Sequence, residues 1–193
     1  YRFSEAAETV YQTVWNSVAD WYIEASKADT NPDMLSWVLQ TTLKLAHPFA
    51  PFVTETIWQT LTWCDGLLMQ QPWPEALVYN EISASEFARL QDLISEVRFV
   101  MNELPGNKKY PLLYGNDSLI ADNQAIIKLL SRAKTIEHTD QPRGLRLANT
   151  GREAWLDVDE QTLYDHQSNL EVRLAEAHTQ KDRLESRLAN ENY

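Results

Sequence analysis

The sequence has little of several features that would point to a particular chemistry. It contains a single cysteine, Cys64, among 193 residues, which excludes an intramolecular disulfide framework and is typical of a reducing compartment. It has only five glycines, and neither a Gly-x-Gly-x-x-Gly nor a Gly-x-x-x-x-Gly-Lys motif occurs, so a glycine-rich nucleotide-binding loop is excluded. No apolar run reaches the roughly 20 residues that span a bilayer, and no signal peptide is present. We therefore expect a soluble, cytoplasmic protein.

Positive charge is scarce as well. The chain has 17 Lys and Arg against 28 Asp and Glu, a net charge of −11. Residues 1–80 hold three basic and nine acidic side chains, net −6. Only residues 98–152 reverse the balance, with nine basic and five acidic side chains, net +4. If the protein meets a polyanion, this stretch is the expected place of contact.

What the chain does have is apolar and aromatic material. Hydrophobic residues make up 44% of it, with seven Trp and eight Tyr, which is enough for a packed core. It begins at Tyr1 without an initiator Met and reaches Tyr193 without a helix stop signal. We therefore expect a piece of a longer protein, in which an active site can lie elsewhere.

The first 80 residues predict a helical bundle. Apolar residues recur at three- and four-residue steps in the first segment, which is typical of an amphipathic helix. Asn31-Pro32-Asp33 is typical of a second helix start, and Pro48 disfavours helical geometry in the residue before it. The predicted helices cover residues 3–25, 31–47 and 51–61, followed by a loop over 63–74.

The bundle carries aromatic residues at helical spacing, namely Trp15, Trp21, Tyr22, Trp37 and Trp58. They could stack on unpaired nucleotides or form the core of the bundle. The spacing favours the core for Trp15, Trp37 and Trp58. His47, which precedes a proline at a helix corner, is interpreted as a structural hydrogen-bonding residue rather than a base or a metal ligand.

Residues 81–157 change in character and predict a small α+β region. Ser83-x-x-Glu86 reads as a capping box before a fourth helix, and Leu104-Pro105-Gly106-Asn107 ends that helix. Turn residues then separate short β-rich runs from one helical segment. The prediction is a small antiparallel sheet backed by one or two helices, with strands over 110–114, 133–139, 145–149 and 153–158 and a helix over 121–132.

Residues 158–193 predict a coiled-coil helix. Apolar positions recur every seven residues, and further leucines lie four residues after some of them. The heptad positions are Leu156, Leu163, Leu170, Ala177 and Leu184, with Leu174 and Leu188 at the second apolar position. Such a helix needs a partner, either a second helix beyond Tyr193 or another chain. We therefore predict that it is poorly ordered in a dilute monomer or packs against a neighbouring molecule in a crystal.

The candidate site residues are basic. Lys108 and Lys109 come first because Pro105-Gly106-Asn107 shapes an exposed turn before them, although a solvated surface explains them equally well. His138, His166 and His178 have no Cys or His at ligand spacing, so no metal site is predicted. No catalytic constellation is present. The residues predicted to contact a polyanion are Arg98, Lys108, Lys109, Arg132, Lys134, Arg143 and Arg146, and the resemblance described next implies that this polyanion is RNA.

Four blocks of sequence carry a resemblance to a known family. They are Tyr1-Arg2-Phe3-Ser4-Glu5-Ala6-Ala7 followed by Trp15, then Asp20-Trp21-Tyr22-Ile23-Glu24, then His47-Pro48-Phe49-Ala50-Pro51-Phe52-Val53-Thr54-Glu55-Thr56-Ile57-Trp58-Gln59, and finally Pro72-Trp73-Pro74. In this order they resemble the anticodon-binding bundle of class I aminoacyl-tRNA synthetases, the valyl, leucyl, isoleucyl and methionyl enzymes. An insert after the bundle is followed by a terminal helix with Leu156-Asp157 at its start. Together with Arg187-Leu188-Ala189-Asn190-Glu191-Asn192-Tyr193 near the end of that helix, this arrangement resembles the valyl-tRNA synthetase family.

The resemblance implies a fold and a function. The fold is mainly α: an anticodon-binding bundle over 1–80, a small α+β region over 81–157, and over 158–193 the first helix of a coiled-coil arm whose second helix is missing. The implied role is to position tRNA(Val) for ATP-dependent valylation by a catalytic domain in the rest of the synthetase chain, which would also bind ATP and Mg²⁺. His-x-Gly-His and Lys-Met-Ser-Lys-Ser motifs are absent, so no catalytic residue and no cofactor are expected here. The alternatives are the same region of a leucyl or isoleucyl enzyme, or a coiled-coil protein-interaction module without RNA binding.

Overall fold

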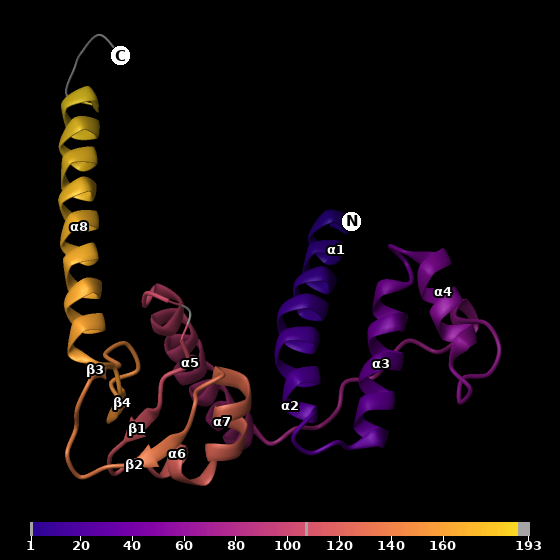
Figure 1. Ribbon diagram of the computed structural model, residues 1–193. Coiled ribbons are helices and arrows are strands. Elements are labelled where there is room, and N and C mark those ends of the chain that lie inside the picture. The colour runs from indigo at the N-terminus through magenta and orange to yellow at the C-terminus, as the bar shows by residue number, and fades with distance from the viewer. Residues whose placement is uncertain (1, 107, 189–193) are drawn as a thin grey trace. The chain divides into compact units, whose positions relative to one another are not determined.

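The computed structural model describes residues 2–106 and 108–188 (Figure 1). Predictions made for Asn107 and for residues 189–193 lie outside the described residues. The chain divides into two compact units, an N-terminal unit, Tyr1–Ala84, and a C-terminal unit, Ser85–Tyr193. The architecture is mainly helical, with a small four-stranded sheet and a long last helix, which confirms the predicted fold class. The three-part division of the chain stays a prediction.

The N-terminal unit begins with one long helical stretch, as predicted. The helix α1 (Phe3–Gln12), the π-helical segment η1 (Thr13–Ile23) and α2 (Glu24–Ser26) follow one another without a break. The hydroxyl of Thr13 donates to the carbonyl of Thr9, four residues earlier, at 2.8 Å. Such side-chain bonds to the preceding turn are known to bend helices, and they lie where the α-helix gives way to the π-helix.

The next two helices are those that the prolines and caps predict. The helix α3 (Pro32–Ala46) begins after Asn31, whose side chain accepts from the backbone N–H of Met34 at 3.0 Å. The helix α4 (Pro51–Thr60) follows a short corner, and the 3-10 turn η2 (Leu68–Gln70) lies within the predicted loop.

The corner between α3 and α4 is fixed by a histidine. His47 Nδ1 and Thr54 Oγ1 lie 2.8 Å apart, and the same hydroxyl donates to the carbonyl of Ala50 at 2.8 Å. The structural role predicted for His47 is confirmed.

The core of the N-terminal unit is small. Leu43, Trp58 and Leu68 form it, with Trp58 only 2% exposed, which confirms the prediction for this residue. Trp15 is 64% exposed and Trp37 is 37% exposed, so the core positions predicted for them are wrong. Helical spacing identifies the apolar face of a helix, but it does not determine whether a neighbour covers that face.

The C-terminal unit is built on α5 (Glu81–Glu103), whose first residues still belong to the N-terminal unit. The side-chain oxygen of Asn80 accepts from the backbone N–H groups of Ile82 and Ser83, at 2.9 and 3.1 Å. The predicted capping box starting at Ser83 is therefore wrong, because the helix begins earlier and Asn80 caps it.

Four short strands form one sheet: β1 (Leu112–Tyr114), β2 (Ile136–His138), β3 (Leu145–Arg146) and β4 (Ala154–Leu156). Their order is β2-β1-β4-β3. The antiparallel prediction is correct for the β1–β4 and β3–β4 pairs and wrong for β1–β2, which is parallel. The chain between β1 and β2 passes through the helices α6 (Ser118–Asp122) and α7 (Gln124–Ser131), and such a crossover returns it to the same edge.

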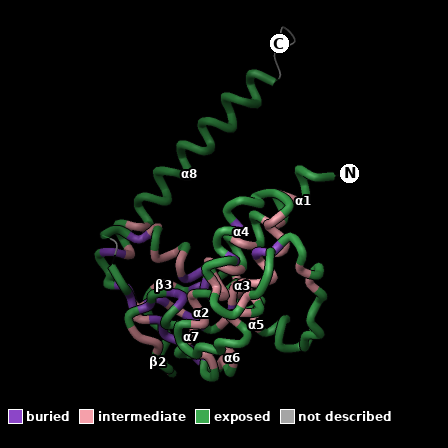
Figure 2. Tube along the Cα trace, turned by 90° about the vertical axis from the view of Figure 1, so that its right-hand side faces the viewer, coloured by how far each residue is buried: buried purple, intermediate pink, exposed green. Residues whose placement is uncertain are grey.

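The last helix, α8 (Glu160–Leu188), confirms the predicted long helix. It begins later than the heptads suggest, because Leu156 lies in β4 and is fully buried there. Leu170, Leu174, Leu184 and Leu188 are between 44% and 85% exposed, and Figure 2 shows α8 exposed over most of its length. An ion pair between Arg173 and Glu103 joins α8 to the end of α5. The disorder predicted for this helix in a dilute monomer stays a prediction.

Candidate nucleic-acid interface

The sheet brings several loops to one edge. Since β1 and β2 are parallel and β4 is antiparallel to both β1 and β3, the strands β1, β2 and β3 begin where β4 ends. Backbone bonds extend this register beyond the strands. Lys134 N donates to Tyr110 O at 2.9 Å, and Asp157 N donates to Pro111 O at 2.9 Å. The segments before β1, β2 and β3 therefore meet at this edge.

Five of the seven predicted residues belong to these segments. Lys108 and Lys109 precede β1, Arg132 and Lys134 precede β2, and Arg143 precedes β3, and all five are exposed. We call this set the basic edge. Residues up to 35 positions apart in sequence are thus gathered by topology, which residue spacing alone does not reveal. Whether these residues touch RNA stays a prediction.

The residues of the basic edge differ in whether their positive charge is already engaged by a carboxylate of the chain. Arg143 donates from Nε and Nη2 to the two carboxylate oxygens of Asp157, at 3.1 and 2.8 Å, and this hydrogen bonding raises the pKa of Arg143. The positive charge of Lys108 helps to lower the pKa of Asp159, after the larger contribution of the hydrogen bonds from Thr162.

The remaining three members of the basic edge are Lys109, Arg132 and Lys134. None of them makes an ion pair within the described part of the chain, so their charges are open to an anion.

The other two predicted residues lie elsewhere in the unit. Arg98 is half-buried on α5, and its Nε donates to the carbonyl of Leu130 at 2.7 Å, which joins α5 to the end of α7. This contact gives Arg98 a structural role. Arg146 is exposed on β3, opposite Trp155 in the register, and so shares a face of the sheet with that aromatic ring.

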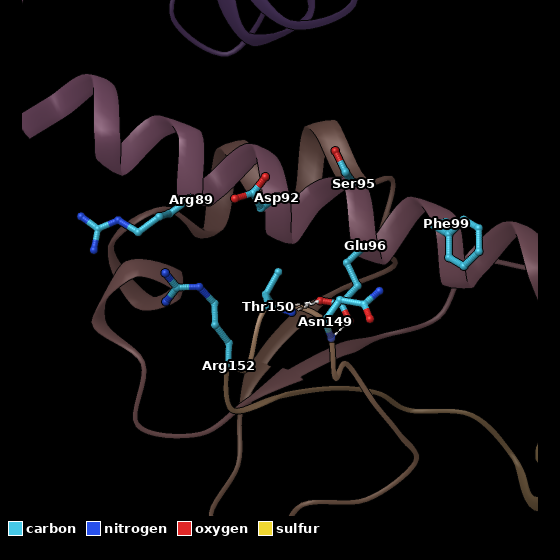
Figure 3. Close-up of a pocket in the computed structure, with 8 residues that line it drawn as sticks. All are labelled: Arg89, Asp92, Ser95, Glu96, Phe99, Asn149, Thr150 and Arg152. Carbon is cyan, nitrogen blue, oxygen red and sulfur yellow. Dashed lines mark hydrogen bonds between the residues drawn. The ribbon is translucent and has the colours of Figure 1, made fainter. Parts of the chain in front are cut away.

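A second feature was missed by the sequence analysis. A groove of about 590 Å³ lies between α5 and the β3–β4 loop (Figure 3). Its lining residues are Arg89, Asp92, Ser95, Glu96, Phe99, Asn149, Thr150 and Arg152. The spacing of 89, 92, 96 and 99 places four of them on one helix face, which the sequence could have revealed. The residues that line the other side of the groove lie some 50 residues further along the chain. The sequence could not reveal that they meet α5.

The His, Cys, Asp and Glu side chains of the described chain are the other candidates for chemistry. Among residues 2–106 and 108–188, no group of three or more His, Cys, Asp or Glu side chains is placed to hold a metal ion. Burial raises the pKa of the Cys64 thiol, and Lys44 acts in the opposite direction to a smaller extent, so the thiol is not activated. No helix of the described chain is long and apolar enough to cross a membrane.

Comparison with known proteins identifies the family. The family described as anticodon-binding domain of tRNA ligase matches residues 1–113, which is more than half of the chain. The chain belongs to this family of anticodon-binding domains.

The similar proteins indicate a particular member of this family. It is similar to proteins named valine–tRNA ligase, with 33% identity to the one from Rhizobium meliloti, 30% to the one from Geobacillus kaustophilus and 29% to the one from Thermotoga maritima. Each alignment covers 100% of this chain and 23–25% of the relative, so the chain spans about a quarter of the length of these proteins. The resemblance to valyl-tRNA synthetases is confirmed.

Proposed function

We propose that this chain is the tRNA-binding, anticodon-binding part of a valine–tRNA ligase. The observation that carries the proposal is the family match over residues 1–113 together with similarity to valine–tRNA ligases over the whole chain. Its role is to hold tRNA(Val) while the rest of the synthetase, with ATP and Mg²⁺, attaches valine to the tRNA in the cytoplasm. The chain alone carries no catalysis.

The charge distribution supports binding of RNA at one positively charged region rather than non-specific binding over the whole surface. Phosphate contacts dominate the affinity of proteins for nucleic acids, and they require positive charge that is not already neutralised. The N-terminal unit offers little of it. Lys27 is paired with Glu24 at 2.6 Å, and Lys44 lies 5.9 Å from the ring centroid of Trp58. The basic edge, in which Lys109, Arg132 and Lys134 make no ion pair within the described part of the chain, is the richer source.

Paired substitutions at the basic edge test this assignment. Lys108→Ala with Lys109→Ala should weaken binding of tRNA(Val) and reduce the slope of log K against log[salt] by about one unit per lost phosphate contact. The matched control is Lys27→Ala with Lys44→Ala, which removes the same charge from the N-terminal unit. Fluorescence titrations of tRNA(Val) at several salt concentrations measure both. A larger loss from the control pair would place recognition on the bundle instead.

A second candidate function rests on the exposed leucines of α8, which suit a protein-interaction module. In that case the chain should bind no tRNA even at low salt, and it should form concentration-dependent oligomers. A leucyl or isoleucyl origin is distinguished by competition, because unlabelled tRNA(Val) should displace bound tRNA(Val) more effectively than tRNA(Leu) or tRNA(Ile). Valine-dependent pyrophosphate exchange by the chain alone would contradict the assignment of catalysis to the absent part.

A further inference from the structure

In the groove between α5 and the β3–β4 loop, hydrogen bonds to Glu96 hold the loop against the helix. Glu96 is only 6% exposed, and its carboxylate accepts from Asn149 N at 2.7 Å, from Thr150 N at 3.0 Å and from Thr150 Oγ1 at 2.8 Å. These charge-assisted bonds attach the loop to the helix across more than 50 residues of sequence. Both carboxylate oxygens are engaged, so Glu96 holds the groove in shape and leaves the other side chains to meet a ligand.

One end of the groove offers positive charge. Figure 3 shows the guanidinium groups of Arg89 and Arg152 at the same end, with Asp92 projecting from α5 beside them. Arg152 is paired with Asp117 at 2.7 Å, and both side chains are largely buried. Arg89 is exposed, and the hydrogen bond that its side chain makes within the described chain is a 3.4 Å bond from Nε to Ser85 O, a backbone carbonyl rather than a carboxylate. Its charge therefore remains available to an anion.

The other end offers an aromatic ring and an amide. Phe99 is 60% exposed, although it lies beside a core in which its neighbour Val97 is fully buried. The side-chain amide of Asn149 is exposed as well, and only its backbone N–H is bonded in the described structure. An amide presents a donor and an acceptor side by side, which matches the edge of a nucleobase.

The dimensions fit a short segment rather than a single ion. Ten residues of α-helix separate Arg89 from Phe99, a distance of about 15 Å along the helix axis. Proteins bind unpaired nucleotides with this combination of aromatic stacking, amide hydrogen bonds and arginine contacts to phosphate. The carboxylate of Asp92 disfavours a phosphate beside it, but it can accept from the exocyclic amine of a base.

We propose that this groove binds an unpaired segment of the bound tRNA, with a base stacked on Phe99, a base edge on the amide of Asn149 and a phosphate at Arg89. The proposal rests on the proposed tRNA-binding function. It adds a site for unpaired nucleotides that is separate from the basic edge, because Asn149 and Arg152 lie between the end of β3 and the start of β4, at the opposite edge of the sheet.

Single substitutions in the full chain test the groove. Phe99→Ala should weaken binding of tRNA(Val), and of a short single-stranded RNA of mixed sequence, about tenfold, because stacking on an aromatic ring contributes on this scale. Phe99→Trp should preserve binding. Arg89→Ala should weaken binding and lower the salt slope for the single strand by about 0.7, the effect of one phosphate contact. Phe99→Ala should leave that slope unchanged.

The controls separate a local effect from misfolding and from failure of the proposed function. Tyr164→Ala removes an aromatic ring that is 70% exposed on α8, outside the groove, and should bind the single strand as wild type does. The unfolding midpoint of Phe99→Ala should match wild type, since the ring is exposed. If the wild-type chain binds no tRNA, the proposed function fails. If it binds tRNA and the Phe99, Arg89 and Asn149 alanine variants bind equally well, the groove assignment is wrong and the proposed function stands.

Discussion

The two units both contain amphipathic helices, but they differ in how much of their apolar surface they bury. Of the buried apolar residues in the described chain, three lie in the N-terminal unit and 17 in the C-terminal unit. The N-terminal unit nevertheless holds six of the seven tryptophans. Its amphipathic helices form as their patterns predict, and much of their apolar surface stays uncovered. Amphipathicity sets where a helix forms, whereas burial depends on which element packs against it.

The contrast has a structural cause. In the C-terminal unit, β1 is buried on every residue, because its side chains alternate between two faces that are both covered. The N-terminal unit closes only a small cluster around Trp58, between α3, α4 and the loop that follows. On the first helical stretch, Tyr11 and Trp15 stack with ring centroids 6.5 Å apart while both stay more than half exposed.

The largest expected effect on the free energy of unfolding comes from truncating a buried side chain in the core of the C-terminal unit. Ile94→Ala, at a fully buried position of α5, should lower the free energy of unfolding of the C-terminal unit by about 2–5 kcal/mol. Trp15→Ala removes a larger side chain that is 64% exposed, and should change the stability of the N-terminal unit by about 0.5 kcal/mol.

Amide hydrogen exchange, read separately for the two units, measures both changes, since a chain of two units does not unfold as a single two-state system. Equal losses for Ile94→Ala and Trp15→Ala would show that the face of Trp15 is covered in solution, and the comparison would then fail.

A smaller effect is expected from two carboxylates that hold loops. Glu96→Ala should destabilise the C-terminal unit by about 2–3 kcal/mol, because it leaves the N–H groups of Asn149 and Thr150 without a charged acceptor. The counterpart in the N-terminal unit is Glu55, which is half-buried and accepts from Leu68 N at 3.1 Å. Glu55→Ala should cost about 1 kcal/mol, since water can replace it more easily.

Thermal and urea unfolding of the two variants provide the measurement. A more costly Glu55→Ala would mean that the N-terminal unit depends on its loop more than its sparse core indicates. Glu96→Gln, which keeps the shape of the acceptor without its charge, should lose less than Glu96→Ala.

The sequence predicted what depends on neighbouring residues and missed what depends on distant ones. The start of α3 at Asn31-Pro32 and the hydrogen-bonding role of His47 follow from local chemistry, and both are confirmed. The strand predicted over 153–158 contains β4, but the seven-residue repeat also placed Leu156 at the start of the last helix, which is wrong because the repeat continues into β4 by coincidence. The parallel pairing of β1 and β2 was not predicted, because it depends on the end of the sheet to which the chain returns after α6 and α7.

The candidate site divides in the same way. Residue type and charge balance predicted which basic residues to consider, among them Lys134 and Arg143. Their meeting at one edge of the sheet required the strand order. The ion pair of Arg143 with Asp157 and the bond from Arg98 to Leu130 O were equally invisible, because each joins residues brought together only by folding.

The smallest expected effect distinguishes the helix caps of the two units. Asp159 caps α8 by accepting from the backbone N–H and the hydroxyl of Thr162, both at 2.9 Å, and these bonds lower the pKa of its carboxyl in the folded chain. Its contribution to stability is therefore fully present above the unfolded pKa of about 3.9, and is lost as the pH falls through the lower folded value. Asn31, which caps α3 in the N-terminal unit, does not titrate.

The amide chemical shifts of Thr162 and Met34, followed by NMR between neutral and acid pH, compare the two caps directly. The Thr162 shift should move with a midpoint below about 3.9, and the Met34 shift should stay constant over the same range. Asp159→Asn keeps a capping side chain without the charge, so it should abolish the Thr162 transition while leaving α8 helical. A Thr162 midpoint at or above the unfolded value would mean that the cap does not hold in solution. The first turn of α8 would then be anchored only by packing around the buried side chain of Thr162.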